Sequence, residues 1–121
     1  MNSTLWERIE QARSDWNVLE HPFYQRWSAG ELTREELADY SGQYRYATEA
    51  IARMSADIAT AAPAAERNGL KNHAREEAEH IAMWDGFVEA VGGTVGATPN
   101  AETLECVETW RSHGQAVTAV A

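Results

Sequence analysis

Residues 33–58 read TREELADYSGQYRYATEAIARMSADI. Thr33 followed three residues later by Glu36 is the pattern of a capping box, in which each side chain bonds the other residue's backbone N–H at a helix start. Beyond this cap, apolar residues recur at steps of three and four, which is the period of an α-helix. They are Leu37, Tyr40, Tyr44, Ala47, Ile51, Met54 and Ile58. The stretch therefore predicts one long amphipathic helix that ends near Ala62 and Pro63.

The opposite face of this predicted helix carries charges of alternating sign at steps of four. They are Arg45, Glu49, Arg53 and Asp57. Opposite charges four residues apart are neighbours on a helix surface and stabilise it weakly. We therefore expect a solvated ladder of ion pairs on this face.

The rest of the chain also has helical periodicity, and no stretch alternates between apolar and polar residues as a half-buried strand does. Cap and turn residues place the other helices at about residues 4–18, a short helix from Pro22, about residues 65–91, and about residues 101–113 after an Asn100 cap. The sequence thus predicts one all-α domain, a helical bundle, over residues 1–121. We expect the apolar stripe of the first helix and all five tryptophans to lie in its core.

Composition excludes several classes of protein. The 121 residues carry a formal net charge of −9, which repels nucleic acid and anionic membrane surfaces. No apolar run is long enough to span a membrane, and no targeting segment is visible. Cys106 is the single cysteine, so no internal disulfide is possible. We therefore expect a cytoplasmic protein with no nucleic-acid or membrane partner.

The stretch from residue 70 to residue 91 holds the candidate chemistry. On a helical wheel, Glu77 lies about 20° from the core direction set by Leu70, while His73 and His80 lie about 60° and 80° away. Glu76 lies further round, at the edge of the core face. An unpaired buried carboxylate costs several kcal/mol, so an inward Glu77 needs a partner, a proton or a metal ion.

Two interpretations of Glu77 and His80 remain open. The Glu-x-x-His spacing places a carboxylate and an imidazole one turn apart, as in helical-bundle di-iron and di-manganese sites, and this donor set favours iron or manganese. Alternatively, Glu77 is ion-paired and His80 is a hydrogen-bonded core residue. His73 is a third ligand, a donor to a ligand, or a core-edge histidine bonded to a carbonyl.

Several motifs resemble the haem-oxygenase-like superfamily, which includes thiaminase II (TenA), PqqC and the haem-oxygenase-like di-iron oxidases. They are HPF at 21–23, GELT at 30–33, GQY at 42–44 and EE-x-x-H-x-x-x-W at 76–84. The last is most similar to the di-iron oxidases, and the resemblance implies that Glu77 and His80 are metal ligands. Glu76 replaces Glu77 if the register is shifted by one.

The resemblance covers only the N-terminal half of that fold, because the second half of its members supplies another carboxylate and a His-rich helix. We expect the bundle to be completed by a second chain or by a missing C-terminal half. A homodimer would bring two Glu-x-x-His elements together, with the apolar end QAVTAVA, residues 115–121, in the interface. Cys106 does not lie in a motif comparable to that of the thiaminases, so we do not expect thiaminase activity.

The predicted function is an iron-containing, di-iron oxidase or oxygenase that acts with O₂ on a small organic substrate held near Tyr44 and Trp84. Manganese is the alternative metal. The alternative function is a non-catalytic or truncated helical interaction module of the same superfamily.

Overall fold

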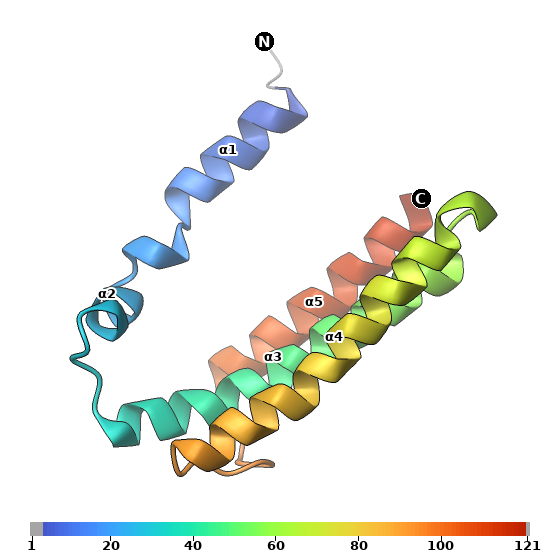
Figure 1. Cartoon of the computed structure of the whole chain (residues 1–121). Coiled ribbons are helices and arrows are strands. Elements are labelled where there is room, and N and C mark those ends of the chain that lie inside the picture. The colour runs from blue at the N-terminus through green and yellow to red at the C-terminus, as the bar shows by residue number, and fades with distance from the viewer. Residues whose placement is uncertain (1–3, 121) are drawn as a thin grey trace. The chain divides into compact units, whose positions relative to one another are not determined.

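The computed structural model of the protein describes residues 4–120, and the side chains of residues 4–112. Its helices are α1 (Leu5–Asp15), a 3₁₀ turn (Val18–Glu20), α2 (Pro22–Ser28), α3 (Arg34–Ala61), α4 (Ala64–Ala90) and α5 (Ala101–Val120), as Figure 1 shows. The part of the chain that the structure describes contains no strand, which confirms the all-α prediction. None of these helices combines the length and apolarity that crossing a membrane requires.

The chain divides into two compact units, Met1–Thr33 and Arg34–Ala121. In the first unit, α1 begins with a capping box between Thr4 and Glu7, and α2 begins at Pro22 as predicted. The His21 ring accepts a hydrogen bond from the Phe23 backbone N–H at 3.1 Å, so this histidine caps α2. The prediction that one domain spans residues 1–121 stays a prediction.

Within the first unit, the apolar stripe of α1 has no core to pack on, and the expectation that it lies in a core of the whole chain stays a prediction. No residue of α1 is buried, and the side chains of Trp6 and Trp16 are 77% and 81% exposed. An amphipathic helix buries its stripe only against another layer, and the first unit provides no such layer for α1. Trp27 of α2 is half-buried and stacks on Tyr24.

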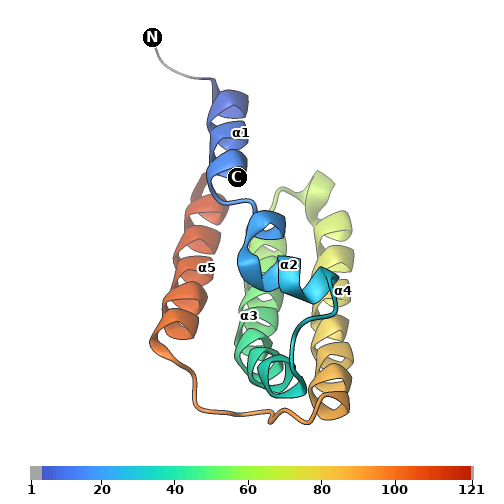
Figure 2. The ribbon, with the colours of Figure 1, turned by 90° about the vertical axis from the view of Figure 1, so that its left-hand side faces the viewer.

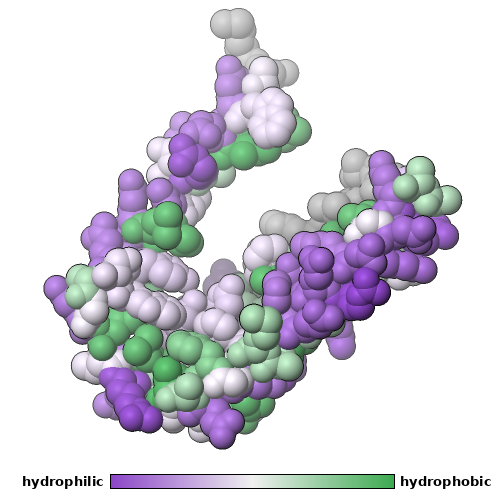
Figure 3. All heavy atoms as spheres, viewed as in Figure 1, coloured by the Kyte–Doolittle hydropathy of each residue, from purple (hydrophilic) through white to green (hydrophobic). Residues whose placement is uncertain are grey.

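In the second unit, α3 lies between α4 and α5, as Figure 2 shows. Both outer helices pack on α3 and, among the described residues, not on each other. The bounds of α3 and α4 agree with the prediction to within one or two residues, whereas α5 continues beyond residue 113. The side chains of the apolar end, residues 115–121, lie outside the described residues. The first half of α4 presents a mainly hydrophilic surface in Figure 3, typical of an amphipathic helix.

Small side chains of α3 allow this close packing. Its buried residues are Ser41, Gly42, Ala47, Ala52, Ser55 and Ala59. From α4, the Trp84 indole N–H donates a hydrogen bond to the backbone carbonyl of Ser41 at 2.8 Å, and Val88 is 1% exposed. Small residues in a contact surface let helix axes approach one another, because no bulky side chain separates the backbones.

An ion pair also joins α3 to α4. Arg45 donates to both carboxylate oxygens of Asp85, with Nε to Oδ1 at 2.7 Å and Nη2 to Oδ2 at 3.3 Å, and it also pairs with Glu49. The Arg45 side chain is 16% exposed, so the predicted solvated ladder is wrong at this position. The hydrogen bond from Arg45 holds the pKa of the Asp85 carboxyl below its usual range.

Residues 91–100 connect α4 to α5 and are held against α3. The Gln43 side chain donates to the Thr98 carbonyl at 3.0 Å and accepts from the Asn100 N–H and the Thr103 hydroxyl at 3.0 and 2.6 Å. Gly92 has φ +77°, a left-handed conformation that favours glycine at a helix end. At Gly93, a Cβ atom would lie 2.8 Å from the Ala38 carbonyl oxygen, so glycine is required there for space.

Replacement of Gly93 by alanine is therefore expected to destabilise the protein by about 1–3 kcal/mol, the usual effect of overpacking. Urea unfolding of Gly93→Ala followed by circular dichroism measures this. Gly86→Ala is the matched control, because a Cβ at Gly86 in α4 meets no atom within 4 Å and alanine favours helix. Equal stability of the two variants would contradict the packing argument.

The Arg45–Asp85 pair predicts a pH dependence. Because the pKa of Asp85 is lowered in the folded state, its ionisation stabilises the fold above the unfolded-state value near 4 and loses this effect as pH falls through the folded-state value. Asp85→Asn is expected to be less stable than wild type at pH 7 by about 0.2–1 kcal/mol, as for a partly exposed pair, and to approach wild type as pH falls below the folded-state pKa of Asp85. Asp57→Asn, which removes an unpaired carboxylate of α3, should show neither effect. A pH-independent difference for Asp85→Asn would refute this account.

Candidate metal centre

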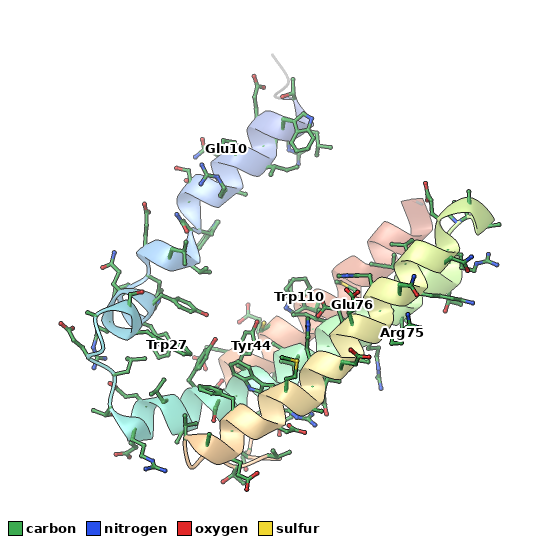
Figure 4. The ribbon with its side chains drawn as sticks, viewed as in Figure 1. Glu10, Trp27, Tyr44, Arg75, Glu76 and Trp110 are labelled. Atoms are coloured by element: carbon green, nitrogen blue, oxygen red, sulfur yellow. The ribbon has the colours of Figure 1, made fainter. Side chains whose placement is uncertain are left out.

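Glu77 lies on α4 between two histidines, with His73 one turn before it and His80 one turn after it. The Glu77 side chain is 21% exposed, whereas those of His73 and His80 are 57% and 53% exposed. Glu76 is exposed, so the prediction that Glu77 is the more inward of the two carboxylates agrees with the burial of these residues. In Figure 4, Glu76 and Arg75 mark the neighbouring positions on α4.

The two imidazoles approach different oxygens of the Glu77 carboxylate. Nδ1 of His80 lies 3.1 Å from Oε2, within hydrogen-bond distance. Nε2 of His73 lies 3.6 Å from Oε1, beyond that distance, so this contact is electrostatic and depends on protonation of the ring. Both histidines are more exposed than a core position implies, because the side of α4 that carries them is not covered by α5.

Aromatic side chains follow His80 on the same side of α4. Trp84 lies one turn beyond His80, and its ring centroid is 4.8 Å from that of Tyr44 on α3 and 4.8 Å from that of Phe87. Tyr40 stacks on Tyr44 at 5.4 Å. Figure 4 labels Tyr44 at this position. The rings form an aromatic wall between α3 and α4, and its Trp84 follows His80 by one turn of α4.

Glu77 and His80 fit part of a metal site. A carboxylate oxygen and an imidazole nitrogen 3.1 Å apart are donors of the kind that iron and manganese accept. Within the described residues, however, no three His, Cys, Asp or Glu side chains form a group that holds a metal ion. Glu77 and His80 as metal ligands therefore stay a prediction, in which the pair would offer two donor atoms. The same 3.1 Å contact also satisfies the alternative interpretation, a self-contained Glu–His pair.

Cys106 lines a cavity of about 260 Å³ between α3 and α5, together with Tyr40, Tyr44 and Gln43. The thiol is exposed, and no described histidine lines the cavity with it. The carboxylate that lines this cavity with Cys106 is that of Glu102. Gln43 lies in the GQY motif, and its side chain holds the start of α5 to α3, a role that the motif alone did not indicate.

Comparison with known proteins places this geometry in a family. Residues 9–108 match the TENA/THI-4/PQQC family. Similar curated proteins named 4-aminobenzoate synthase come from Chlamydia muridarum (36% identity over 81 residues, 63% of this chain and 34% of the relative) and Nitrosomonas europaea (29% over 116 residues, 84% and 47%). Another is from Chlamydia trachomatis (35% over 83 residues, 64% and 36%).

These alignments leave much of each relative unmatched. The chain spans between 34% and 47% of the length of these three curated relatives. No solved structure matches the chain significantly. The family match covers most of the chain, including the EE-x-x-H element. The chain therefore belongs to the TENA/THI-4/PQQC family, within the haem-oxygenase-like superfamily.

Proposed function

We propose that this chain contributes Glu77 and His80 to the metal site of an oxidase or oxygenase that uses O₂ on a small organic substrate. The observation that carries the proposal is the half-buried Glu77 carboxylate with the His80 ring nitrogen at 3.1 Å, on the EE-x-x-H element of a family member. Iron is the proposed metal, in a di-iron site, with manganese as the alternative. Bound iron would supply the activation of O₂.

The chain's own residues have two tasks in this proposal. Glu77 offers Oε2 on the side of His80, so the two side chains form one edge of the ligand set. The rings of Tyr44 and Trp84 form an apolar wall next to that edge, where a planar organic substrate would lie out of water. The name 4-aminobenzoate synthase of the relatives supports a substrate or product of aromatic character.

The remaining ligands require a second contribution of protein. In helical-bundle di-metal sites, two helices each contribute a Glu and two others each contribute a Glu-x-x-His motif. This chain supplies one such motif, so we propose that a second copy or another chain segment completes the bundle.

The single exposed Cys106 suits a reducing compartment, and we propose a cytoplasmic location.

A non-catalytic interaction module is the second candidate. It is favoured by one observation, that the described residues hold no group of three metal-binding side chains. In that case the Glu77–His80 contact is structural, and the uncovered side of α3 and α4 serves a protein partner.

Metal titration separates the two candidates. The purified chain is titrated with Fe²⁺ under argon and with Mn²⁺, with metal content measured by mass spectrometry. Wild type is expected to bind iron, while Glu77→Ala and His80→Ala each weaken binding by at least about tenfold, since even loss of a supporting residue has that effect. Glu79→Ala, which removes an exposed carboxylate of the same helix, is the matched control and should bind as wild type does.

Native mass spectrometry of the same samples identifies the source of the other ligands. Iron bound only to a dimer supports completion by a second copy. A wild-type chain that takes up no iron or manganese above the Glu77→Ala level, as a monomer or as a dimer, would refute a metal site completed by a second copy and favour the interaction module.

A further inference from the structure

A second candidate site lies on the opposite face of α3 from the aromatic wall. Arg53 follows Tyr44 by nine residues, which is two and a half helical turns, so their side chains leave α3 in opposite directions. A cavity of about 510 Å³ opens there on α3, and it is also lined by Ile81 of α4 and by residues of α5. Its apolar lining includes Met54 of α3 and Val107 of α5, and its charged lining includes Arg53, Asp57 and Arg111.

The series of alternating charges predicted along α3 is not paired throughout, and its unpaired members lie at this cavity. Arg45 forms ion pairs with Asp85 of α4 and with Glu49. The next arginine of α3, Arg53, therefore forms no ion pair with Glu49. Among the described residues, neither Arg53 nor Asp57 makes an ion pair or a side-chain hydrogen bond.

The other charged groups at the cavity are already engaged. Glu49 is held by Arg45, and Arg111 lies 3.5 Å from Glu108 on its own helix. The cavity therefore presents one free cation, Arg53, and one free anion, Asp57, above an apolar floor, within the part of the chain that the structure describes. A cavity of this volume is in the usual range for a small-molecule site, where an apolar surface binds the body of the ligand and a few polar groups orient it.

We propose that this cavity binds a small zwitterion, an amino acid with an apolar side chain. The Arg53 guanidinium matches a carboxylate in geometry and charge, and the Asp57 carboxylate accepts hydrogen bonds from an ammonium group. The apolar side chain of the ligand lies on Met54 and Val107. A polyanion such as a nucleotide is disfavoured, because Glu49 and Asp57 bring two negative charges to the same cavity. This inference does not depend on the proposed metal site.

Binding of three related probes tests the proposal by isothermal titration calorimetry. The probes are L-phenylalanine, 3-phenylpropionate, which lacks the ammonium group, and 2-phenylethylamine, which lacks the carboxylate. The wild-type chain is expected to bind L-phenylalanine about five- to tenfold more tightly than either analogue, the discrimination typical of one partly exposed charge-assisted contact.

Variants assign each charge to its partner. Arg53→Ala should abolish the preference for L-phenylalanine over 2-phenylethylamine, and Asp57→Ala should abolish the preference over 3-phenylpropionate. Arg75→Ala, on α4 and hydrogen-bonded to Asn72, is the matched control and should change neither ratio. Val107→Trp, which fills the apolar floor, should weaken all three probes.

Three outcomes would overturn the proposal. One is the absence of saturable binding of L-phenylalanine to a folded chain. Another is equal affinity for the three probes, and the last is the wild-type preference persisting in both Arg53→Ala and Asp57→Ala. Glu77→Ala should bind L-phenylalanine as wild type does, so a failed metal site and a failed zwitterion site give different results.

Discussion

The close contact of α4 with α3 is the constraint on which the rest of the second unit depends. Ser41, Ala52, Ser55 and Ala59 lie on one stripe of α3 by their spacing and are buried. Because these side chains are small, the Trp84 indole reaches the backbone of α3 and bonds a carbonyl there. The position of α4 in turn decides where its site residues lie.

This packing gives the second unit two open faces of different chemistry. α4 and α5 each pack on α3 and, among the described residues, not on each other, which leaves a face of α3 on either side between them. One face carries the Glu77–His80 pair and the wall formed by Tyr44 and Trp84. The other carries the cavity near Arg53. The chain belongs to this family and spans less than half the length of these relatives, and the two proposed sites lie on these two faces.

The Glu77–His80 pair shows which properties of a candidate site the local sequence predicts and which it does not. The spacing of Glu77 and His80 predicted that they lie one turn apart. The helical wheel correctly predicted that Glu77 is more buried than the adjacent Glu76. The wheel did not indicate that both flanking histidines are more than half exposed, because exposure depends on which neighbouring helix covers that side of α4. Whether a metal ion binds there depends on ligands that no single helix supplies.

The sequence by itself determined the helices, their caps and the family, since periodicity, capping residues and motifs are local properties of the chain. It also determined that Gly92 and Gly93 end α4, but not that Gly93 is needed for space beside the Ala38 carbonyl. Only the tertiary structure decided that Arg45 pairs with Asp85 of α4 and that a cavity opens beside Arg53. The physical reason is that burial and ion pairing depend on the partner a side chain meets, and such partners lie far away in the sequence: forty residues separate Arg45 from Asp85.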